Sequence, residues 1–375
     1  MKLALLQEDL NRALATVVRF VASRPQLPVL ANILFSAEKN NQLRLAATNL
    51  DLGVQFWLPA KVDQPGQLAI PAKEISEFIS YLPAAKLTLS SEDKLRLKVT
   101  TPTGETVFSG LAADEFPQFP ELDQKKMVQL KLEALKEAVG QVAFAAANDD
   151  TRPVLTALQW QFQSQGYQLV ATDGYRLSLK TVAESGLKLA NQEKATFLVP
   201  ARSLTEWVRL ASNESEFGLG LTPDQNQVIF LLPQLQLSAR LIEGDFPEYQ
   251  KIIPHQTKTE VVLEREPLIQ AIRMASVFAR ESANIVKLVI KENQVAVMAQ
   301  AASVGENKTL VEAQVQGPEL TIAFNYRFLL DFLNAVPETE TEVVLKFNEP
   351  LSPGVFQARQ DSSWLHLIMP VRVGL

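Results

Sequence analysis

The chain contains the same structural unit three times, and this repetition limits the folds open to it more than any other feature. Three matching segments are "GQLAIPAKEISEFISYLP" at 66–83, "ATFLVPARSLTEWVRLA" at 195–211 and "LTIAFNYRFLLDFLNAVP" at 320–337. Each predicts a short apolar strand followed by an amphipathic helix, because apolar residues recur three and four positions apart. A unit that recurs at a spacing of about a third of the chain indicates a repeat architecture.

The rest of the unit repeats as well. The stretch "LRLAATNLDLGVQF" at 43–56 matches "YQLVATDGYRLSLK" at 167–180, and each third opens with a further strand and helix. Alternating strands, punctuated by Asn, Asp, Gly and Pro, follow each helix. We therefore predict an α+β protein of three similar domains, 1–125, 126–253 and 254–375, each with about two helices and eight antiparallel strands.

Two helices can cover only one face of such sheets, and the strands at the sheet edges then need partners. Open edges invite pairing with another chain. Repeated units that pair edge to edge form either an open array or a closed ring. The repeat pattern thus predicts an assembly of domains with helices on one side and strands on the other.

Composition limits the class of protein. The 375 residues include no cysteine, which excludes disulfides, thiolate metal sites and cysteine nucleophiles. The apolar run within the opening "MKLALLQEDL" is too short for the core of a signal peptide. No apolar run in the sequence is long enough to span a membrane. These features predict a soluble, cytoplasmic protein.

The charge balance argues at first against nucleic acid, since the formal net charge is −6. Basic groups nevertheless recur along the opening helices: Arg12 and Arg19 are seven positions apart, as are Arg273 and Arg280. Residues seven apart share a helix face. If the helices line one side of the assembly, a loose contact with the phosphate backbone, independent of base sequence, becomes plausible.

Catalytic patterns are missing from the sequence. It holds no glycine-rich phosphate loop, no G-x-S-x-G elbow and no HExxH pair, and its two histidines, His255 and His366, are far apart. The neighbours Asp149 and Asp150 are read as a solvated turn. Asp173 is read as part of an Asp-Gly hairpin turn, in which Gly174 supplies the positive φ.

Seven segments together resemble one known family along essentially the whole chain, the β subunits of bacterial DNA polymerase III, which are the replicative sliding clamps. They are "SRPQLPVLANILF" (23–35), "TRPVLTALQW" (151–160), "VATDGYRLSL" (170–179), "LVPARSL" (198–204), "GDFPEYQKIIP" (244–254), "FNYRFLLDFLNA" (324–335) and "MPVRV" (369–373). The resemblance implies a head-to-tail homodimer, a ring of six domains that encircles double-stranded DNA and tethers the polymerase. It implies no catalytic activity and no cofactor.

The resemblance also implies three sets of functional residues. A hydrophobic cleft between the second and third domains, which takes short peptides of partner proteins, would use Leu155, Thr172, Gly174, Tyr175, Arg176, Leu177, Pro247, Lys251, Ile252, Leu367, Met369 and Pro370, with Arg176 and Lys251 offering charge at its rim. DNA contacts would come from Arg24, Lys73, Arg152, Arg202, Asn325 and Arg372. The subunit interface would use Thr106, Val107 and Phe108 of the first domain against Val277 and Phe278 of the third.

The implied partners are duplex DNA bound without regard to sequence, the polymerase III alpha subunit, the clamp-loader ATPase complex, other proteins with clamp-binding peptide motifs and a second copy of the chain, with no membrane. The alternative reading is a repeat scaffold that binds only short linear peptides of proteins. A hydrolase or transferase that uses Asp149, Asp150 or Asp173 is a third class, which nothing in the sequence supports. Two departures from the family pattern are Ala157, where relatives often have Gly, and the final Gly374-Leu375.

Overall fold

The structure is a computed structural model that describes residues 1–91, 93, 95–120, 127–187, 189, 195–211, 213–254 and 256–372. The chain divides into two compact units. Unit 1 comprises Met1–Leu132, Leu189–Gln192 and Glu206–Leu241, and unit 2 comprises Glu133–Lys188, Glu193–Thr205 and Ile242–Leu375. The boundary expected between residues 125 and 126, His255 and the final Gly374-Leu375 lie outside the described residues.

Each repeat contributes two helices within the described residues, as the sequence predicts. They are α1 (Gln7–Val17), α2 (Ala72–Tyr81), α3 (Leu132–Val142), α4 (Ala201–Leu210), α5 (Arg265–Ala279) and α6 (Tyr326–Ala335). In α1 the buried side chains include Leu10, Leu14 and Val17. This spacing of three and four forms one apolar stripe that packs on a sheet. The α+β class and the helix pattern are therefore confirmed.

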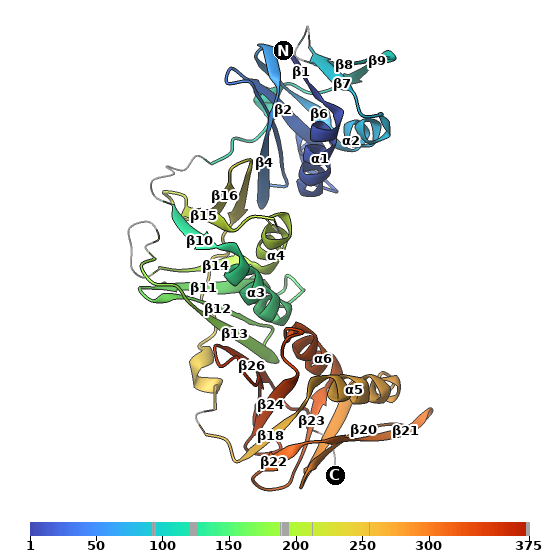
Figure 1. Ribbon diagram of the computed structural model, residues 1–375, viewed down its shortest axis with the longest axis vertical. Coiled ribbons are helices and arrows are strands. Elements are labelled where there is room, and N and C mark those ends of the chain that lie inside the picture. Colours follow the sequence, from blue (N-terminus) through green and yellow to red (C-terminus); the bar gives the residue numbers. More distant parts are fainter. Residues whose placement is uncertain are drawn as a thin grey trace. The chain divides into compact units, whose positions relative to one another are not determined.

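Unit 1 contains two antiparallel sheets (Figure 1). A five-stranded sheet has the order β5-β1-β7-β8-β9, with β1 (Lys2–Leu6), β5 (Lys61–Gln64), β7 (Lys86–Ser90), β8 (Arg96–Thr101) and β9 (Gly104–Ser109). An eight-stranded sheet has the order β10-β15-β16-β17-β4-β3-β2-β6, with β2 (Asn32–Glu38), β3 (Gln42–Thr48), β4 (Leu52–Pro59), β6 (Gly66–Pro71), β10 (Val128–Lys131), β15 (Glu216–Leu221), β16 (Gln227–Leu232) and β17 (Leu235–Arg240). Strands of the first and second repeats thus share one sheet, joined where β4 pairs with β17. We call this pairing the first junction.

Unit 2 repeats this plan. A nine-stranded sheet has the order β14-β11-β12-β13-β26-β25-β24-β18-β22, with β11 (Ala157–Gln163), β12 (Gly166–Thr172), β13 (Arg176–Ala183), β14 (Ala195–Pro200), β18 (Thr259–Glu264), β22 (Gln314–Gln316), β24 (Glu342–Phe347), β25 (Gly354–Ala358) and β26 (Trp364–Ile368). A four-stranded sheet has the order β21-β20-β19-β23, with β19 (Ile285–Lys291), β20 (Gln294–Ala301), β21 (Gly305–Glu312) and β23 (Leu320–Asn325). Strands of the second and third repeats meet where β13 pairs with β26, and we call this pairing the second junction.

The strand count is close to the expected eight per repeat. Among the described residues the first and third repeats have nine strands and the second has eight, and the additional ones are short, such as β5 and β22. All the pairings are antiparallel. In the described part of the chain, no helix is both long and apolar enough to span a membrane.

Candidate peptide-binding cleft

The second junction brings together two of the segments that the sequence assigned to a cleft. β13 and β26 pair in antiparallel register, with Leu177 opposite Leu367. Beyond the end of β26, the N–H of Met369 donates to the carbonyl of Tyr175 over 2.8 Å. Residues about half the chain apart in sequence therefore lie on adjacent strands, because the sheet continues from one repeat into the next.

An apolar floor covers the face of this junction that points away from the helices, which we call the outer face. Leu177 and Leu367 are almost fully buried there. They belong to a compact cluster whose other members are Val170, Tyr249 and Val355, with Leu179, Phe246, Ile253 and Leu365 packed against it. Successive strand residues point to opposite faces, so Leu177 and Leu179 share the outer face with Leu365 and Leu367.

The borders of this floor carry exposed apolar side chains. Tyr175 is 63% exposed, Ile252 46% and Met369 40%. Exposed large apolar residues that gather beside an apolar floor make this border a candidate binding surface. Pro247 and Lys251 are also exposed, whereas Leu155 is buried in a short 3-10 helix, Pro153–Thr156.

Sequence reasoning missed part of the floor. Val170 and Tyr249 lie within two of the segments that carry the resemblance and Val355 lies outside them, but none of the three residues was assigned to the cleft. The alternation of Leu177 and Leu179 with Leu365 and Leu367 was a usable signal, since both pairs had to share one face. Tyr249 had no such signal. Its ring joins the cluster because its hydroxyl donates to Gln168 Oε1 over 2.9 Å.

The Asp-Gly corner is a turn, as predicted. Thr172 Oγ1 donates to the carbonyl of Arg176 over 2.6 Å, and Asp173 Oδ1 accepts the N–H groups of Tyr175 and Arg176. Gly174 has a φ of +93°, a conformation that favours glycine. The Asp173 carboxylate is thus occupied with the turn. Thr172 is buried and acts in the turn.

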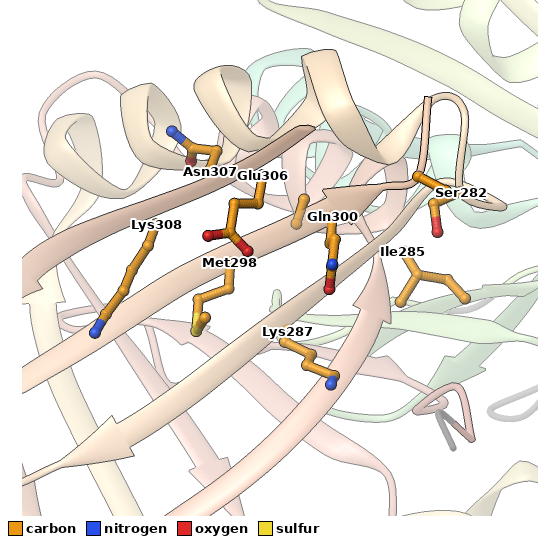
Figure 2. Close-up of a pocket in the computed structure, with 10 residues that line it drawn as sticks. Ser282, Ile285, Lys287, Met298, Gln300, Glu306, Asn307 and Lys308 are labelled. Carbon is orange, nitrogen blue, oxygen red and sulfur yellow. The ribbon is translucent and has the colours of Figure 1, made fainter. Parts of the chain in front are cut away.

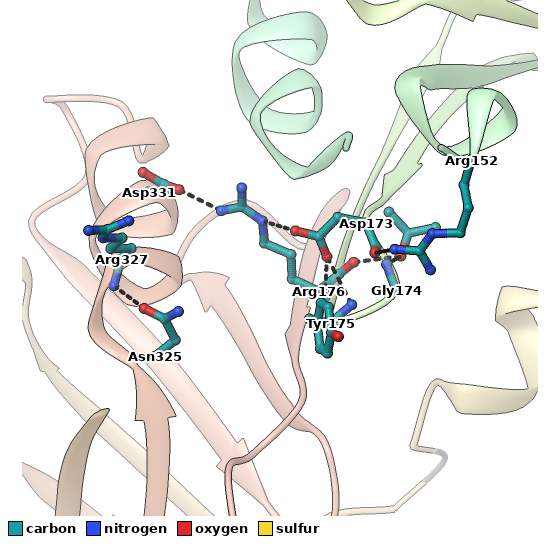
Figure 3. Close-up of polar contacts among 9 residues, drawn as sticks. Arg152, Asp173, Gly174, Tyr175, Arg176, Asn325, Arg327 and Asp331 are labelled. Carbon is teal, nitrogen blue, oxygen red and sulfur yellow. Dashed lines mark hydrogen bonds and ion pairs between the residues drawn. The ribbon is translucent and has the colours of Figure 1, made fainter. Parts of the chain in front are cut away.

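Arg176 does not lie at the rim, which corrects the expectation for its charge. Its side chain is only 7% exposed and forms ion pairs with Asp173 over 3.0 Å and with Asp331 over 2.5 Å (Figure 3). The guanidinium lies 4.5 Å from the Phe328 ring centroid. The physical reason is strand alternation: Arg176 follows Tyr175 and precedes Leu177, so it points toward the helices when Leu177 points outward. Lys251, the other residue expected to place charge at the rim, is exposed and pairs with Glu248.

The six candidate DNA-contact residues fall into two groups by environment. Arg24 and Lys73 in unit 1, and Arg202 and Arg372 in unit 2, are exposed. Arg152 is exposed too, but its guanidinium also donates to the carbonyl of Asp173 over 3.2 Å. Asn325 caps helix α6, its side-chain oxygen accepting the N–H of Arg327 over 3.0 Å. This bond gives Asn325 a structural role that the sequence reading did not foresee.

The candidate interface residues lie on sheet edges and an adjacent helix. In unit 1, β9 is the last strand of its sheet, and Val107 on it is 57% exposed, while Phe108 packs edge-on against Phe78 with ring centroids 5.4 Å apart. Thr106 is half-buried. In unit 2, Val277 on α5 is exposed and Phe278 is half-buried against the core.

A separate hollow of about 480 Å³ lies on the four-stranded sheet of unit 2 (Figure 2). It is lined by Ser282, Ile285, Lys287, Met298, Ala299, Gln300, Ala302, Glu306, Asn307 and Lys308. None of these residues belongs to the candidate cleft. The hollow borders β21, the edge strand of that sheet.

The described residues offer no cluster of three or more histidine or acidic side chains able to hold a metal ion. Asp149 accepts hydrogen bonds from Thr151, which hold the pKa of its carboxyl below the ordinary value. It is an exposed turn residue, in line with the sequence reading. His366 is fully buried, and burial, together with the positive charge of Arg176, lowers its pKa to about 3. A base so placed stays neutral and has no path to a substrate.

Comparisons with known proteins cover the whole chain. Three family models match in succession: the N-terminal domain of the DNA polymerase III beta subunit over residues 1–120, the central domain over 129–248 and the C-terminal domain over 250–372. The beta sliding clamp of a Synechocystis strain is 33% identical over 394 residues, and that of Synechococcus elongatus is 32% identical over 377, with full coverage of both chains. The crystal structure of the Bacillus subtilis DNA polymerase sliding clamp superposes with a TM-score of 0.94 at 26% identity, again over the full length of both chains.

Proposed function

Since the chain belongs to the family of DNA polymerase III beta subunits, we propose that it is a sliding clamp, a processivity factor that encircles duplex DNA and tethers the replicative polymerase. The observation that carries the proposal is the triplicated fold, in which each repeat is joined to the next by continuous antiparallel sheet. The domains would be those expected from the repeats, 1–125, 126–253 and 254–375, in line with the three family-model matches.

The ring would close by the same kind of pairing that forms the two junctions. β9 ends a sheet of unit 1 and β21 ends a sheet of unit 2, so each offers a row of unpaired backbone groups. The exposed Val107 of one copy would pack near Val277 on α5 of the next. A head-to-tail contact of this kind joins unlike surfaces and closes only when the rotation permits a ring.

DNA would pass through the ring and be held loosely. Arg24, Lys73, Arg152, Arg202 and Arg372 are the candidates for contact with phosphates, and Asn325 is a weaker one because it caps α6. Contacts with phosphates position a protein without reading base sequence. A ring gains its hold on DNA from topology, which is compatible with a net charge of −6.

The cleft at the second junction would take a short extended peptide. Its apolar floor, centred on Leu177 and Leu367, would hold apolar anchors, and Tyr175 and Met369 would close over them from the border. The peptide would belong to the polymerase III alpha subunit, the clamp-loader ATPase complex or another replication protein. The clamp itself would catalyse no reaction, and it would act in the cytoplasm, on the chromosome.

The test compares circular with linear DNA. Loaded by its clamp loader, the protein should stay on a nicked circle and leave a linear duplex of the same sequence, because a ring slides off free ends. Light scattering at micromolar concentration should give the mass of two 41.6 kDa chains. Equal retention on both DNAs would contradict the ring. Peptide binding without retention on either DNA would favour a scaffold that binds proteins alone.

A further inference from the structure

The two faces of the second junction carry opposite kinds of side chain. On the outer face of β13 lie Leu177 and Leu179. On the face toward the helices lie Arg176, Ser178 and Lys180, all buried. A row of three buried polar side chains on one strand is unusual, since such groups are costly to bury unless each has a partner.

Lys180 is bound from two sides. Its side chain is 7% exposed, and its ammonium group donates to Glu137 Oε1 on α3 over 2.8 Å and to Asp361 Oδ2 over 2.6 Å. Asp361 stands just before β26 and is itself held by the N–H of Ser363. One cation on the second repeat thus connects its own helix to the start of a strand of the third repeat.

Ser178 and Arg176 continue this pattern along the strand. Ser178 Oγ donates to the carbonyl of Gln141 on α3 over 2.6 Å and accepts the indole N–H of Trp364 on β26 over 2.8 Å. Arg176 reaches Asp331 on α6. Each of the three polar residues therefore makes a directional contact with the third repeat.

The outer face alone distinguishes only weakly between alignments of these strands. Leu177 lies opposite Leu367, and Leu179 opposite Leu365. A slip of two residues keeps these side chains on the same face and again places one leucine against a leucine, while the other leucine meets Ser363 or Met369. The same slip would move Asp361 about 7 Å along the strand and break its contact with Lys180.

We propose that Lys180, Ser178 and Arg176, with their carboxylate, carbonyl and indole partners, are positioning residues that set the alignment of β13 with β26 and thereby keep the two walls of the peptide cleft together. The proposal rests on the cleft function proposed above. Lys180 allows the clearest test of the three, because it lies on the face opposite the apolar floor and cannot touch a peptide bound there. Buried ionic groups that specify one arrangement are a known use of such pairs.

Cross-linking tests the alignment directly, because the chain has no cysteine of its own. We would introduce the opposite pair Leu179→Cys with Leu365→Cys, and two pairs that meet only after a slip of two residues, Leu179→Cys with Leu367→Cys and Leu177→Cys with Leu365→Cys. A disulfide forms only between side chains that are directly opposite. In the otherwise unchanged protein the opposite pair should cross-link and the slipped pairs should not. In Lys180→Met, slipped pairs should cross-link as well.

Peptide affinity gives the second readout. The probe is a fluorescent synthetic peptide with the clamp-binding segment of the polymerase III alpha subunit, followed by anisotropy. Lys180→Met and the milder Asp361→Asn should each weaken its Kd by about fivefold or more. Lys180→Arg should restore most of the affinity. Glu349→Gln, which breaks the exposed pair with Lys258 in the same unit, is the matched control and should change nothing.

The outcomes separate this inference from the proposed function. If the unchanged protein fails to bind the peptide, the cleft function is wrong, while the cross-linking pattern still reports on the alignment. If Lys180→Met and Asp361→Asn lower the unfolding midpoint but keep the cross-linking pattern and the Kd, these residues only add stability, and the inference is overturned. Unchanged values in every readout would overturn it too.

Discussion

The two junctions occupy equivalent places in the repeat but have opposite chemistry. At the first junction the positions that match Arg176, Ser178 and Lys180 are Leu52, Val54 and Phe56. The positions that match Leu177 and Leu179 are Gly53 and Gln55. The first junction is therefore apolar toward the helices and polar outward, and the second is polar toward the helices and apolar outward.

The outer faces of the two junctions differ in whether an apolar floor is left beside exposed side chains. A side chain added at Gly53 would come within 2.8 Å of the Phe119 ring, so that ring rests directly on the strand. At the second junction Leu177 fills the matching position, and the corresponding aromatic residue, Tyr249, is held by Gln168. At the first junction the segment that carries Phe119 covers the outer face. At the second junction the outer face is an apolar floor bordered by exposed side chains.

The largest effect should follow from a buried charge at the first junction. Val54 is fully buried opposite Leu237, so Val54→Asp places a carboxylate in apolar surroundings, and we expect it to destabilise unit 1 by about 4 kcal/mol. Hydrogen exchange of β4 and β17, measured by mass spectrometry, should rise strongly, with no change in β13 and β26. A loss of protection of less than tenfold in β4 would contradict the apolar description of this face.

The next effect concerns the cation at the second junction. Arg176→Ala should destabilise unit 2 by about 3 kcal/mol, because it removes the cation that pairs with Asp173 and Asp331 and opens space beside Phe328. Arg176→Leu, which introduces the residue of the first junction, should cost about 2 kcal/mol, since an apolar side chain fills the space but leaves both carboxylates without the cation. Equal losses for the two variants in denaturant unfolding would show that the charge matters more than the packing.

A smaller effect should come from placing the leucine of the second junction at the matching position on the outer face of the first. Gly53→Leu copies Leu177 into the first junction and must displace the Phe119 ring, at a cost of about 2 kcal/mol from overpacking. The displaced Phe119 ring and the new leucine would then be exposed. Increased binding of a hydrophobic dye, compared with Gly53→Ala, would support this view, whereas unchanged stability would mean that the ring already has room to move.

The effect that is smallest at neutral pH concerns His366, because it appears only as the pH falls. His366 has a pKa of about 3 in the folded protein, below its ordinary 6.5, so only the unfolded chain binds its proton between these values. Its contribution to stability is therefore present above pH 6.5 and is lost as the pH falls toward 3, by about 1.4 kcal/mol per pH unit at most. Its counterpart at the first junction is Leu237, which does not titrate. In His366→Phe the unfolding midpoint of unit 2 should depend less steeply on pH, and an unchanged slope would contradict the assignment.

The fold could be predicted from the sequence in considerable detail, because the repeat supplied three copies of each pattern. The apolar stripe of α1 and the Thr172–Arg176 turn both follow from local physics, helix periodicity and Asp-Gly chemistry. The site was harder. The charge of Arg176 was expected at the rim because the strand alternation that turns its side chain away from Leu177 was not considered. Val355 and Tyr249 were missed because their place in the cleft depends on which strands pair, a property of the folded chain.

The joining of repeats within one chain has a consequence for how such molecules change over time. Two identical subunits that meet through identical edges must accept every substitution twice. A chain that carries its own copies can alter one edge and leave the other as it was. The leucines of β13 and the glycine of β4 differ at matching positions, as such independent change allows, so one junction can be altered while the other keeps its packing.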